Sequence, residues 1–328
     1  MKNVLTAVVA ALALAWAGAA QAQTVLKYAT QLPKTHQLTK ADYRFAELVA
    51  EKSGGRLKVE VYPAGQLYSG PSLVKAVTSG AIEMGIVYGG AWTGPLPLID
   101  LFDIPFLFGD YGAVQRALRG RTGELLRSEM EKRGVRVLSW GAYGESFSLA
   151  SNKHPLRLPK DFEGMKVRAN QPMAAAALKA LGASAVMMSS AEVYVALQRG
   201  TVDGASSGPS TIAQRKWHEV AKYTTLANAS YSIWPVMINL KAWNALPADL
   251  KKVLEEAGAA HEAMTFANAA QEDDESIKLL RERQEAVHVL TGEERAEWAR
   301  RMEAVRTEWL SRAGKEGADV LKWVGEGR

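Results

Sequence analysis

The residue in this chain whose type and position best fit ligand chemistry is Arg168. It lies near the end of a short apolar segment, Met165-Lys-Val-Arg-Ala169, which has the composition of a β-strand. In α/β proteins, ligands bind outside the carboxyl ends of strands, and a guanidinium group holds a carboxylate through two parallel hydrogen bonds. Arg168 is therefore a candidate carboxylate-binding residue. An arginine at a strand end also often forms a surface ion pair, so spacing alone leaves both interpretations open.

A second pattern is typical of nucleophilic catalysis. Gly204-Ala-Ser-Ser-Gly208 fits the Gly-x-Ser-x-Gly elbow of α/β-hydrolases, with Ser206 as the nucleophile. Asp249 and then His261 or His288 follow in the order that such a triad needs. The proline directly after the segment fits poorly into a tight elbow, however, and no His-Gly-Gly segment precedes it. We therefore expect a protein that is not an enzyme, and an exported serine hydrolase is the alternative.

The composition argues against several other kinds of site. The chain has no cysteine, and its five histidines show no metal-ligand spacing. Asp203, in the turn Gly200-Thr-Val-Asp-Gly204, is expected to fix the local backbone rather than bind a cation. No glycine-rich phosphate loop occurs, and the net charge of +5 is spread over segments of mixed charge. We expect no metal, no cofactor and no nucleic acid partner.

The N-terminus has the pattern of a secretory signal peptide. Lys2 precedes an apolar stretch from Val4 to Ala17, and Ala20-Gln-Ala22 supplies small residues at the cleavage site. The apolar stretch is shorter than the ~20 residues that a membrane-spanning helix needs. We therefore expect cleavage after Ala22 and export of the mature protein to the periplasm.

The remaining chain alternates between strand and helix patterns, which is typical of an α/β fold with largely parallel sheets. The expected strands cover residues 25–30, 57–62, 82–88, 165–169 and 287–290; the expected helices cover 38–49, 69–80, a segment ending at Leu181, and 248–285. The last helix is long, and no linker-like segment divides the chain. We therefore expect two lobes joined by strands and by this crossing helix. Thr291-Gly-Glu-Glu294 has the capping-box pattern that begins a further helix.

The order of several motifs resembles the extracytoplasmic solute-binding subunit of TRAP transporters (tripartite ATP-independent periplasmic transporters). In the stretch from Asp161 to Pro209, Gly164-Met-Lys-Val-Arg168 is followed by Leu181-Gly182 and by the Asp203-Gly204 turn. Further motifs in the family's order are Gly65-Gln-Leu67, Ser79-Gly-Ala-Ile-Glu-Met-Gly85, Phe102-Asp-Ile-Pro-Phe-Leu-Phe108 and Trp243-Asn-Ala-Leu-Pro247. Each motif alone is weak, but their order over residues 25–300 makes the resemblance specific.

The resemblance implies a periplasmic binding protein of type II-like architecture, with two α/β lobes, a hinge and a long helix that crosses both lobes. We expect a signal peptide at residues 1–22, a first lobe at 23–147, a second lobe at 148–228, and a return to the first lobe at 229–328. The lobes would close around a small organic acid and deliver it to the small and large membrane-embedded subunits of a TRAP permease. A binding protein of the ABC-transporter type is the nearest alternative.

The resemblance also implies particular binding residues. In the family, the arginine in the place of Arg168 holds the carboxylate of the substrate, and pocket positions correspond to Tyr88, Trp92 and Ser207. Many relatives that bind dicarboxylates or sialic acid carry a second arginine where this chain has Phe147. A cleft with one arginine favours a monocarboxylate, for example a keto, hydroxy or aromatic acid.

Other departures support the same expectation. Relatives that bind a metal beside a keto acid carry Glu-Trp where this chain has Ser206-Ser207. Aromatic side chains would form the walls of the pocket: Tyr88, Trp92, Phe147 and Trp234. His36, near the start of the first helix, completes the expected binding residues. For Trp234, packing in the core is an equally good explanation of the aromatic side chain. For His36, an exposed position at the start of a helix is an equally good explanation. Lys34 or His36 would supply a second positive charge if either side chain reaches the ligand.

Overall fold

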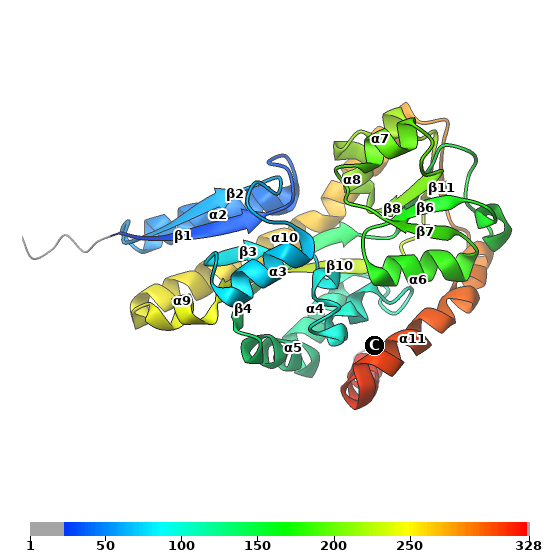
Figure 1. The fold of residues 1–328 in the computed structure, drawn as a ribbon. Helices are drawn as coiled ribbons and strands as arrows, with labels where there is room; N and C mark the ends of the chain where they lie inside the picture. Colours follow the sequence, from blue (N-terminus) through cyan, green and yellow to red (C-terminus); the bar gives the residue numbers. More distant parts are fainter. Residues whose placement is uncertain (1–22, 327–328) are drawn as a thin grey trace, which may run out of the picture.

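The computed structural model describes residues 23–326, which form two lobes, each built on a mixed β-sheet (Figure 1). The signal peptide expected at residues 1–22 lies outside this range. Within the described residues, no helix has the length and apolar character that crossing a membrane requires.

The first lobe contains a five-stranded sheet in the order β2-β1-β3-β10-β4. Its strands are β1 Thr24–Thr30, β2 Leu57–Tyr62, β3 Met84–Ile86, β4 Val135–Glu145 and β10 Tyr231–Asn239. Strand β1 is parallel to β2 and β3, whereas β10 is antiparallel to β3 and β4. The expectation of largely parallel sheets is therefore wrong, because β10 enters from the other lobe and runs in the opposite direction.

Helices cover both faces of this sheet. They are α2 Gln37–Lys52, α3 Gly70–Ser79, α4 Tyr111–Arg119, α5 Arg121–Lys132 and α9 Leu240–Ala245, with 3-10 turns η1 Gly89–Trp92 and η2 Pro97–Asp103. Helix α2 forms because Leu38, Phe45 and Val49 recur on one face, and all three are fully buried. This helix packs on β2 and on the crossing helix α10.

The second lobe contains a six-stranded sheet in the order β11-β9-β5-β8-β6-β7. Its strands are β5 Ser148–Ser151, β6 Lys166–Ala169, β7 Ser184–Met187, β8 Gly204–Ser207, β9 Tyr223–Leu226 and β11 Ala286–Val289. Its helices are α6 Pro172–Leu181, α7 Val193–Gln198 and α8 Pro209–Gln214, with 3-10 turns η3 Pro159–Phe162 and η4 Trp217–Glu219. Strand β11 pairs with β9, so the expected return of the whole segment 229–328 to the first lobe does not hold for β11.

The chain passes between the lobes several times. Strand β4 continues into β5 through residues 146–147, and β9 continues into β10 through residues 227–230. Helix α10, Ala248–Arg283, packs on α2 and β4 in the first lobe and on α8 and β11 in the second (Figure 1).

The C-terminal helix α11, Gly292–Glu326, also joins the two lobes. It bends at Gly314, whose φ of 64° is not helical. Its Trp298 indole donates to the Arg157 carbonyl at 2.9 Å, and its Trp309 indole donates to the Pro97 carbonyl at 2.9 Å. These bonds attach α11 to the second and first lobe, respectively.

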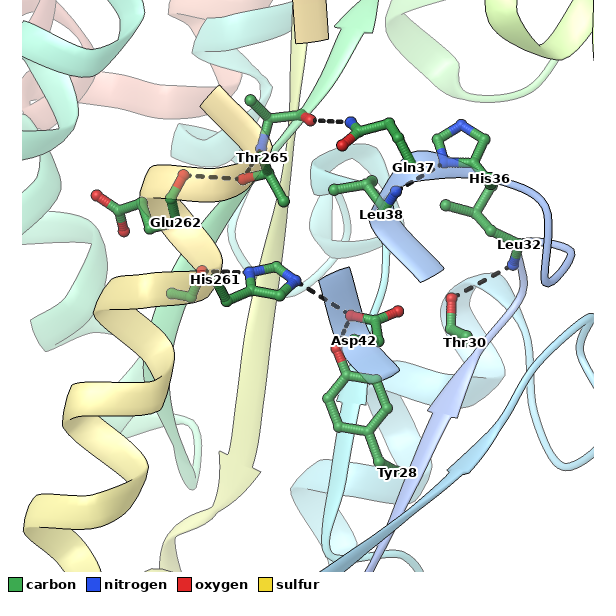
Figure 2. Close-up of polar contacts among 12 residues, drawn as sticks. Tyr28, Thr30, Leu32, His36, Gln37, Leu38, Asp42, His261, Glu262 and Thr265 are labelled. Atoms are coloured by element: carbon green, nitrogen blue, oxygen red, sulfur yellow. Dashed lines mark hydrogen bonds and ion pairs between the residues drawn. The ribbon is translucent and has the colours of Figure 1, made fainter. Parts of the chain in front are cut away.

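A buried polar network fixes α10 against the first lobe. Asp42 of α2 accepts hydrogen bonds from Tyr28 OH at 2.5 Å and from His261 Nε2 at 3.2 Å, as Figure 2 shows. The other ring nitrogen of His261 lies 2.8 Å from the Ser139 hydroxyl of β4. Burial raises the pKa of Asp42 above its ordinary value. One carboxyl group thus holds α2, β1 and α10 together, and His261 extends the network to β4.

Candidate functional site

A cleft of about 600 Å³ lies between the two lobes. The first lobe lines it with the segments that follow β1, β2 and β3 and with residues of β4 and β10. The second lobe contributes the end of β6, the segment between β7 and α7, the end of β8, and helix α8. The cleft therefore lies at the carboxyl ends of parallel strands, where α/β proteins bind ligands.

Arg168 lies at the base of this cleft. It belongs to β6, in register with Val186 of β7 and Ala205 of β8, and only 2% of it is exposed. Its Nε donates to the Met188 carbonyl at 2.9 Å, and its Nη1 donates to the Ser206 carbonyl at 2.8 Å. Two backbone acceptors thus hold the guanidinium group in one orientation.

Among the described residues, Arg168 has no carboxylate partner that balances its charge. Within residues 23–326 it forms no ion pair, and no residue contacts its Nη2 through a hydrogen bond. The guanidinium carbon lies 5.6 Å from the centroid of the Trp217 ring. Burial lowers the pKa of Arg168 to about 10, so the side chain stays charged at neutral pH. A buried, unpaired and immobilised cation is poised to bind an anion.

An aromatic stack forms the wall contributed by the first lobe. The rings of Tyr143 and Trp234 are stacked with centroids 5.5 Å apart, and Tyr88 meets Trp234 edge-on at 5.8 Å. All three line the cleft. His36 stacks on the far side of Tyr143 at 5.2 Å and is 1% exposed, so it lies behind the wall and does not line the cleft.

His36 is held neutral in this position. Its Nδ1 accepts the Leu38 backbone N–H at 3.2 Å, which caps α2. Burial lowers the pKa of His36 to about 3, and the charges of Arg215 and Lys40 lower it further. The neutral ring therefore carries its proton on Nε2, which is buried and has no hydrogen-bond partner within residues 23–326.

A direct contact across the cleft joins the lobes. The hydroxyl of Tyr143, on β4, is hydrogen-bonded to the hydroxyl of Thr211, on α8. Both residues are 5% exposed. Tyr143 was not among the residues expected from the sequence, because its orientation depends on the pairing of β4 with β10.

The expected binding residues divide into two groups. Arg168, Tyr88, Ser207 and Trp234 all line the cleft. Trp92 and Phe147 do not: they are 0% and 3% exposed and belong to the apolar core. Phe147 lies in the crossing from β4 to β5, and its side chain packs into the core rather than lining the cleft in the place of a second cation.

Sequence reasoning missed a second arginine in the cleft. Arg215 follows the last residue of α8, and its side chain lines the cleft together with Arg168. No local signal distinguished it from an ordinary basic residue at the end of a helix. The premise of a one-arginine cleft is therefore wrong.

The residues of the alternative hydrolase do not assemble around Ser206. Its hydroxyl donates to the Arg168 carbonyl at 3.0 Å, and the side chain is fully buried. Asp249 pairs with Arg56, and His288 lies 2.6 Å from Glu294. His261 contacts Ser139 and Asp42 in the network described above, where all three residues are buried.

The glycines of the Gly-x-Ser-x-Gly segment have a packing role. A Cβ on Gly204 would lie 2.8 Å from the Ala150 carbonyl oxygen, and one on Gly208 would lie 2.0 Å from that of Glu145. The segment is glycine-rich because neighbouring backbone approaches it closely. Asp203 accepts the Lys166 N–H at 2.8 Å and pairs with Lys153, which confirms its role in fixing the turn. Within residues 23–326, no cluster of three acidic or histidine side chains could hold a metal ion.

Two α/β lobes around a cleft, with a fixed and unpaired arginine at a strand end, define a binding protein of the two-lobe class. The family model of the bacterial extracellular solute-binding proteins, family 7 (DctP), matches residues 28–312. The chain belongs to this family, which confirms the identification made from the motif order and leaves the ABC-type alternative without support.

Curated relatives cover nearly the whole chain. The C4-dicarboxylate-binding periplasmic protein DctP of Rhodobacter capsulatus is 34% identical over 330 residues, 98% of either chain. The 2,3-diketo-L-gulonate-binding periplasmic protein YiaO of Escherichia coli is 27% identical over 302 residues, 92% of this chain and 91% of its own.

Solved structures have the same fold. A TRAP periplasmic solute-binding protein of Sulfurospirillum deleyianum with bound succinate has a TM-score of 0.85 at 30% identity, covering 93% of this chain and 99% of its own. The sugar acid binding protein DctPAm of Advenella mimigardefordensis, in complex with galactonate, has a TM-score of 0.87 at 27% identity, with 93% and 99% covered. This protein is thus a TRAP periplasmic solute-binding protein with the expected two-lobe α/β fold.

Proposed function

We propose that this protein captures a small organic acid through a carboxylate clamp at Arg168 and delivers it to the membrane-embedded subunits of a TRAP permease. The observation that carries this proposal is the state of Arg168: buried, held by two backbone carbonyls, and without a counter-charge in residues 23–326. A carboxylate that bonds to Nη2 and to the second N–H of Nη1 supplies the missing charge. The protein performs no chemistry on the ligand.

The names of the relatives support an organic acid. They bind C4-dicarboxylates, 2,3-diketo-L-gulonate, succinate and galactonate. All of these ligands carry a carboxylate group. A binding site shared by these proteins therefore needs a residue that holds one carboxylate, as Arg168 is proposed to do here. The expected preference for monocarboxylates rested on a single arginine in the cleft, and Arg215 removes that premise.

Ligand binding and closure are coupled in this proposal. Arg168 and Ser207 lie in the second lobe, whereas Tyr88 and Trp234 lie in the first, so one ligand contacts both lobes. We place the hinge at the crossings 146–147 and 227–230, with residues 23–147 as the first lobe and 148–228 as the second. A ligand that bridges the lobes favours the closed state by its contacts to both.

The proposal is tested by removing the guanidinium group. We expect Arg168→Ala to weaken binding by about 2–5 kcal/mol without unfolding the protein, because a desolvated bidentate partner is lost. Arg168→Lys should also be damaging, since a point charge does not reproduce the fork. The matched control is Arg301→Ala, which removes an exposed arginine on α11.

Thermal unfolding with a broad panel of organic acids finds the ligand. A ligand at 100 times its Kd should stabilise the parent by about 2.7 kcal/mol, and calorimetry then gives the affinities of the variants. Parent-like affinity in Arg168→Ala would place the clamp elsewhere. The absence of a thermal shift with every acid would refute the proposed function.

The periplasmic location has a separate test. We propose cleavage after Ala22, which predicts that the exported protein begins at Gln23. N-terminal sequencing of protein from the periplasmic fraction decides this, and a mature chain that retains residues 1–22 would contradict it.

A further inference from the structure

A buried side-chain contact joins the two lobes outside the lining of the cleft. Gln171 directly precedes α6 in the second lobe as its N-cap residue. Its side chain lies against Gly90 of η1 in the first lobe, where an added Cβ would be 2.0 Å from Gln171 Oε1. The amide also contacts the carboxyl group of Asp103, the last residue of η2. Gln171 and Asp103 are 6% and 5% exposed, so the contact is closed to solvent.

Two oxygen atoms in this contact lack a donor. Within residues 23–326, Gln171 Oε1 and Asp103 Oδ1 are both buried and have no hydrogen-bond partner. Buried polar atoms are nearly always hydrogen-bonded, so two unpaired acceptors in one contact need an explanation. A proton on Asp103 provides it, because a carboxylic acid donates through its O–H and still accepts from the amide N–H. One proton thus satisfies both residues in a reciprocal pair.

The surroundings of Asp103 favour this proton. Burial raises the pKa of Asp103 from 3.8 to about 7, and the amide contact offsets only part of the rise. Asp100 lies one 3-10 turn earlier, where side chains eclipse, and burial together with the charge of Asp103 raises its pKa to about 8. Asp100 accepts the Thr93 hydroxyl at 2.7 Å and lies 3.6 Å from Arg312 Nη1 of α11. Tyr88 is the other titratable neighbour, and burial raises its pKa.

We propose that Gln171 and Asp103 form a latch between the lobes that closes with the uptake of one proton and positions the end of β6 against the first lobe. This inference rests on the proposed function only in taking ligand binding to favour the closed state. When the lobes separate, the Gln171 side chain leaves Asp103, water reaches the carboxyl group, and the group ionises. When the lobes close, the carboxyl group is covered again and takes a proton from the solvent.

The direction of the pH dependence follows from this scheme. The closed state binds the proton more tightly than the open state, in which Asp103 titrates near its ordinary pKa of 3.8. A ligand that favours the closed state therefore takes up a proton as it binds, and its affinity decreases as the pH rises from about 4 to about 7. Within this window, each pH unit changes the affinity by up to ~10-fold.

Calorimetry on the mature protein measures the proton uptake directly. The probes are galactonate and fumarate, whose carboxyl groups stay ionised above about pH 5.5. Titrations at about pH 6 in two buffers of different ionisation enthalpy should show about one proton taken up for each probe molecule bound. The affinity should decrease by at least ~10-fold between about pH 5.5 and about pH 7.5. Binding without proton uptake would overturn the latch.

Two carboxyl variants assign the proton to its residue. Asp103→Asn replaces the protonated carboxyl group by an amide that offers Gln171 the same donor and acceptor. At about pH 7.5 this variant should bind the probes within ~3-fold of the affinity that the parent has at about pH 5.5, with no proton uptake. Asp100→Asn is the matched control and should retain the uptake, because Asp100 contacts Thr93 and Arg312. A parent-like pH profile in Asp103→Asn would count against the proposal.

A glycine variant tests the latch without changing a titratable group. In Gly90→Ala the new Cβ takes the place of Gln171 Oε1, so both probes should bind at least ~5-fold more weakly and the proton uptake should decrease towards zero. The matched control is Gly94→Ala, because an added Cβ there meets no atom within 4 Å. Thermal unfolding without a probe verifies that each variant is folded. Parent-like affinity and proton uptake in Gly90→Ala would refute the latch.

The outcomes separate this inference from the proposed function. If the parent binds the probes equally well at both pH values, the latch is refuted while the clamp at Arg168 stands. If Arg168→Gln binds the probes as tightly as the parent, or if no acid of the thermal panel binds, the proposed function fails instead. Other acids of the panel that bind extend the set of probes.

Discussion

The hydrogen bond between Tyr143 and Thr211 gives a direct test of how ligand binding is linked to closure. It joins β4 of the first lobe to α8 of the second, and both residues are buried. Tyr143→Phe removes the hydroxyl but keeps the ring between His36 and Trp234, so the aromatic stack survives. The expected effect therefore comes from the contacts of this hydroxyl with the second lobe, of which the bond to Thr211 is the strongest.

The size of this effect follows from ordinary hydrogen-bond energies. A buried hydroxyl–hydroxyl bond contributes about 0.5–1.5 kcal/mol net. If the bond exists only in the closed state, its loss falls on ligand affinity, which should decrease by about 2- to 12-fold. The loss of a bond within one lobe should lower stability without this effect on affinity.

A double-mutant cycle isolates the bond from any contact between Tyr143 and the ligand. We expect Tyr143→Phe and Thr211→Val to be non-additive in ligand affinity, with a coupling energy of about 0.5–1.5 kcal/mol by calorimetry. Tyr231→Phe is the matched control, because its hydroxyl donates to the Gly109 carbonyl at 2.9 Å within the first lobe. Strictly additive effects, or equal loss of affinity in Tyr231→Phe, would refute the reasoning.

Two further predictions concern stability. Asp42→Ala leaves Tyr28 OH and His261 Nε2 without their acceptor. The free energy of unfolding measured in urea should therefore decrease by about 2–6 kcal/mol, because each unsatisfied group costs about 1–3 kcal/mol. A decrease smaller than that of the exposed control Glu47→Ala would contradict this prediction. Burial raises the pKa of Glu145 from 4.5 to about 7, so the native state binds its proton more tightly than the unfolded state and stability decreases as pH rises through this window. Deprotonation of Glu145 across this window lowers the free energy of unfolding by about 3 kcal/mol. Glu145→Gln should therefore flatten the pH dependence of the unfolding free energy between about pH 5 and 7. Asp100 and Asp103, with pKa values raised to about 8 and about 7, contribute in the same direction, so some slope remains; an unchanged slope in Glu145→Gln would count against the role of this carboxyl group.

Elements whose signals are local were predicted well. Helix α10 was expected at residues 248–285 and spans Ala248–Arg283. The capping box is confirmed, since the Glu294 N–H lies 3.2 Å from the Thr291 hydroxyl and the Thr291 N–H lies 2.9 Å from the Glu294 carboxylate. These features depend on residues within one or two helical turns, and the sequence displays them directly.

Elements that depend on distant partners were predicted less well. The strand expected at residues 82–88 is limited to Met84–Ile86, because only these residues pair with β10. The sheets are mixed because β10 and β5 arrive from the opposite lobe. Strand direction is set by the path of the chain between lobes, and no local pattern records that path.

The site shows the same division. The sequence by itself determined that an arginine ends a strand in a family of carboxylate-binding proteins, because the motif around Arg168 is contiguous. Only the tertiary structure decided that Trp92 and Phe147 lie in the core, that Tyr143 bridges the lobes, and that Arg215 lines the same cleft as Arg168. The reason is physical: which side of a strand or a short helix meets the cleft depends on packing between residues far apart in the chain.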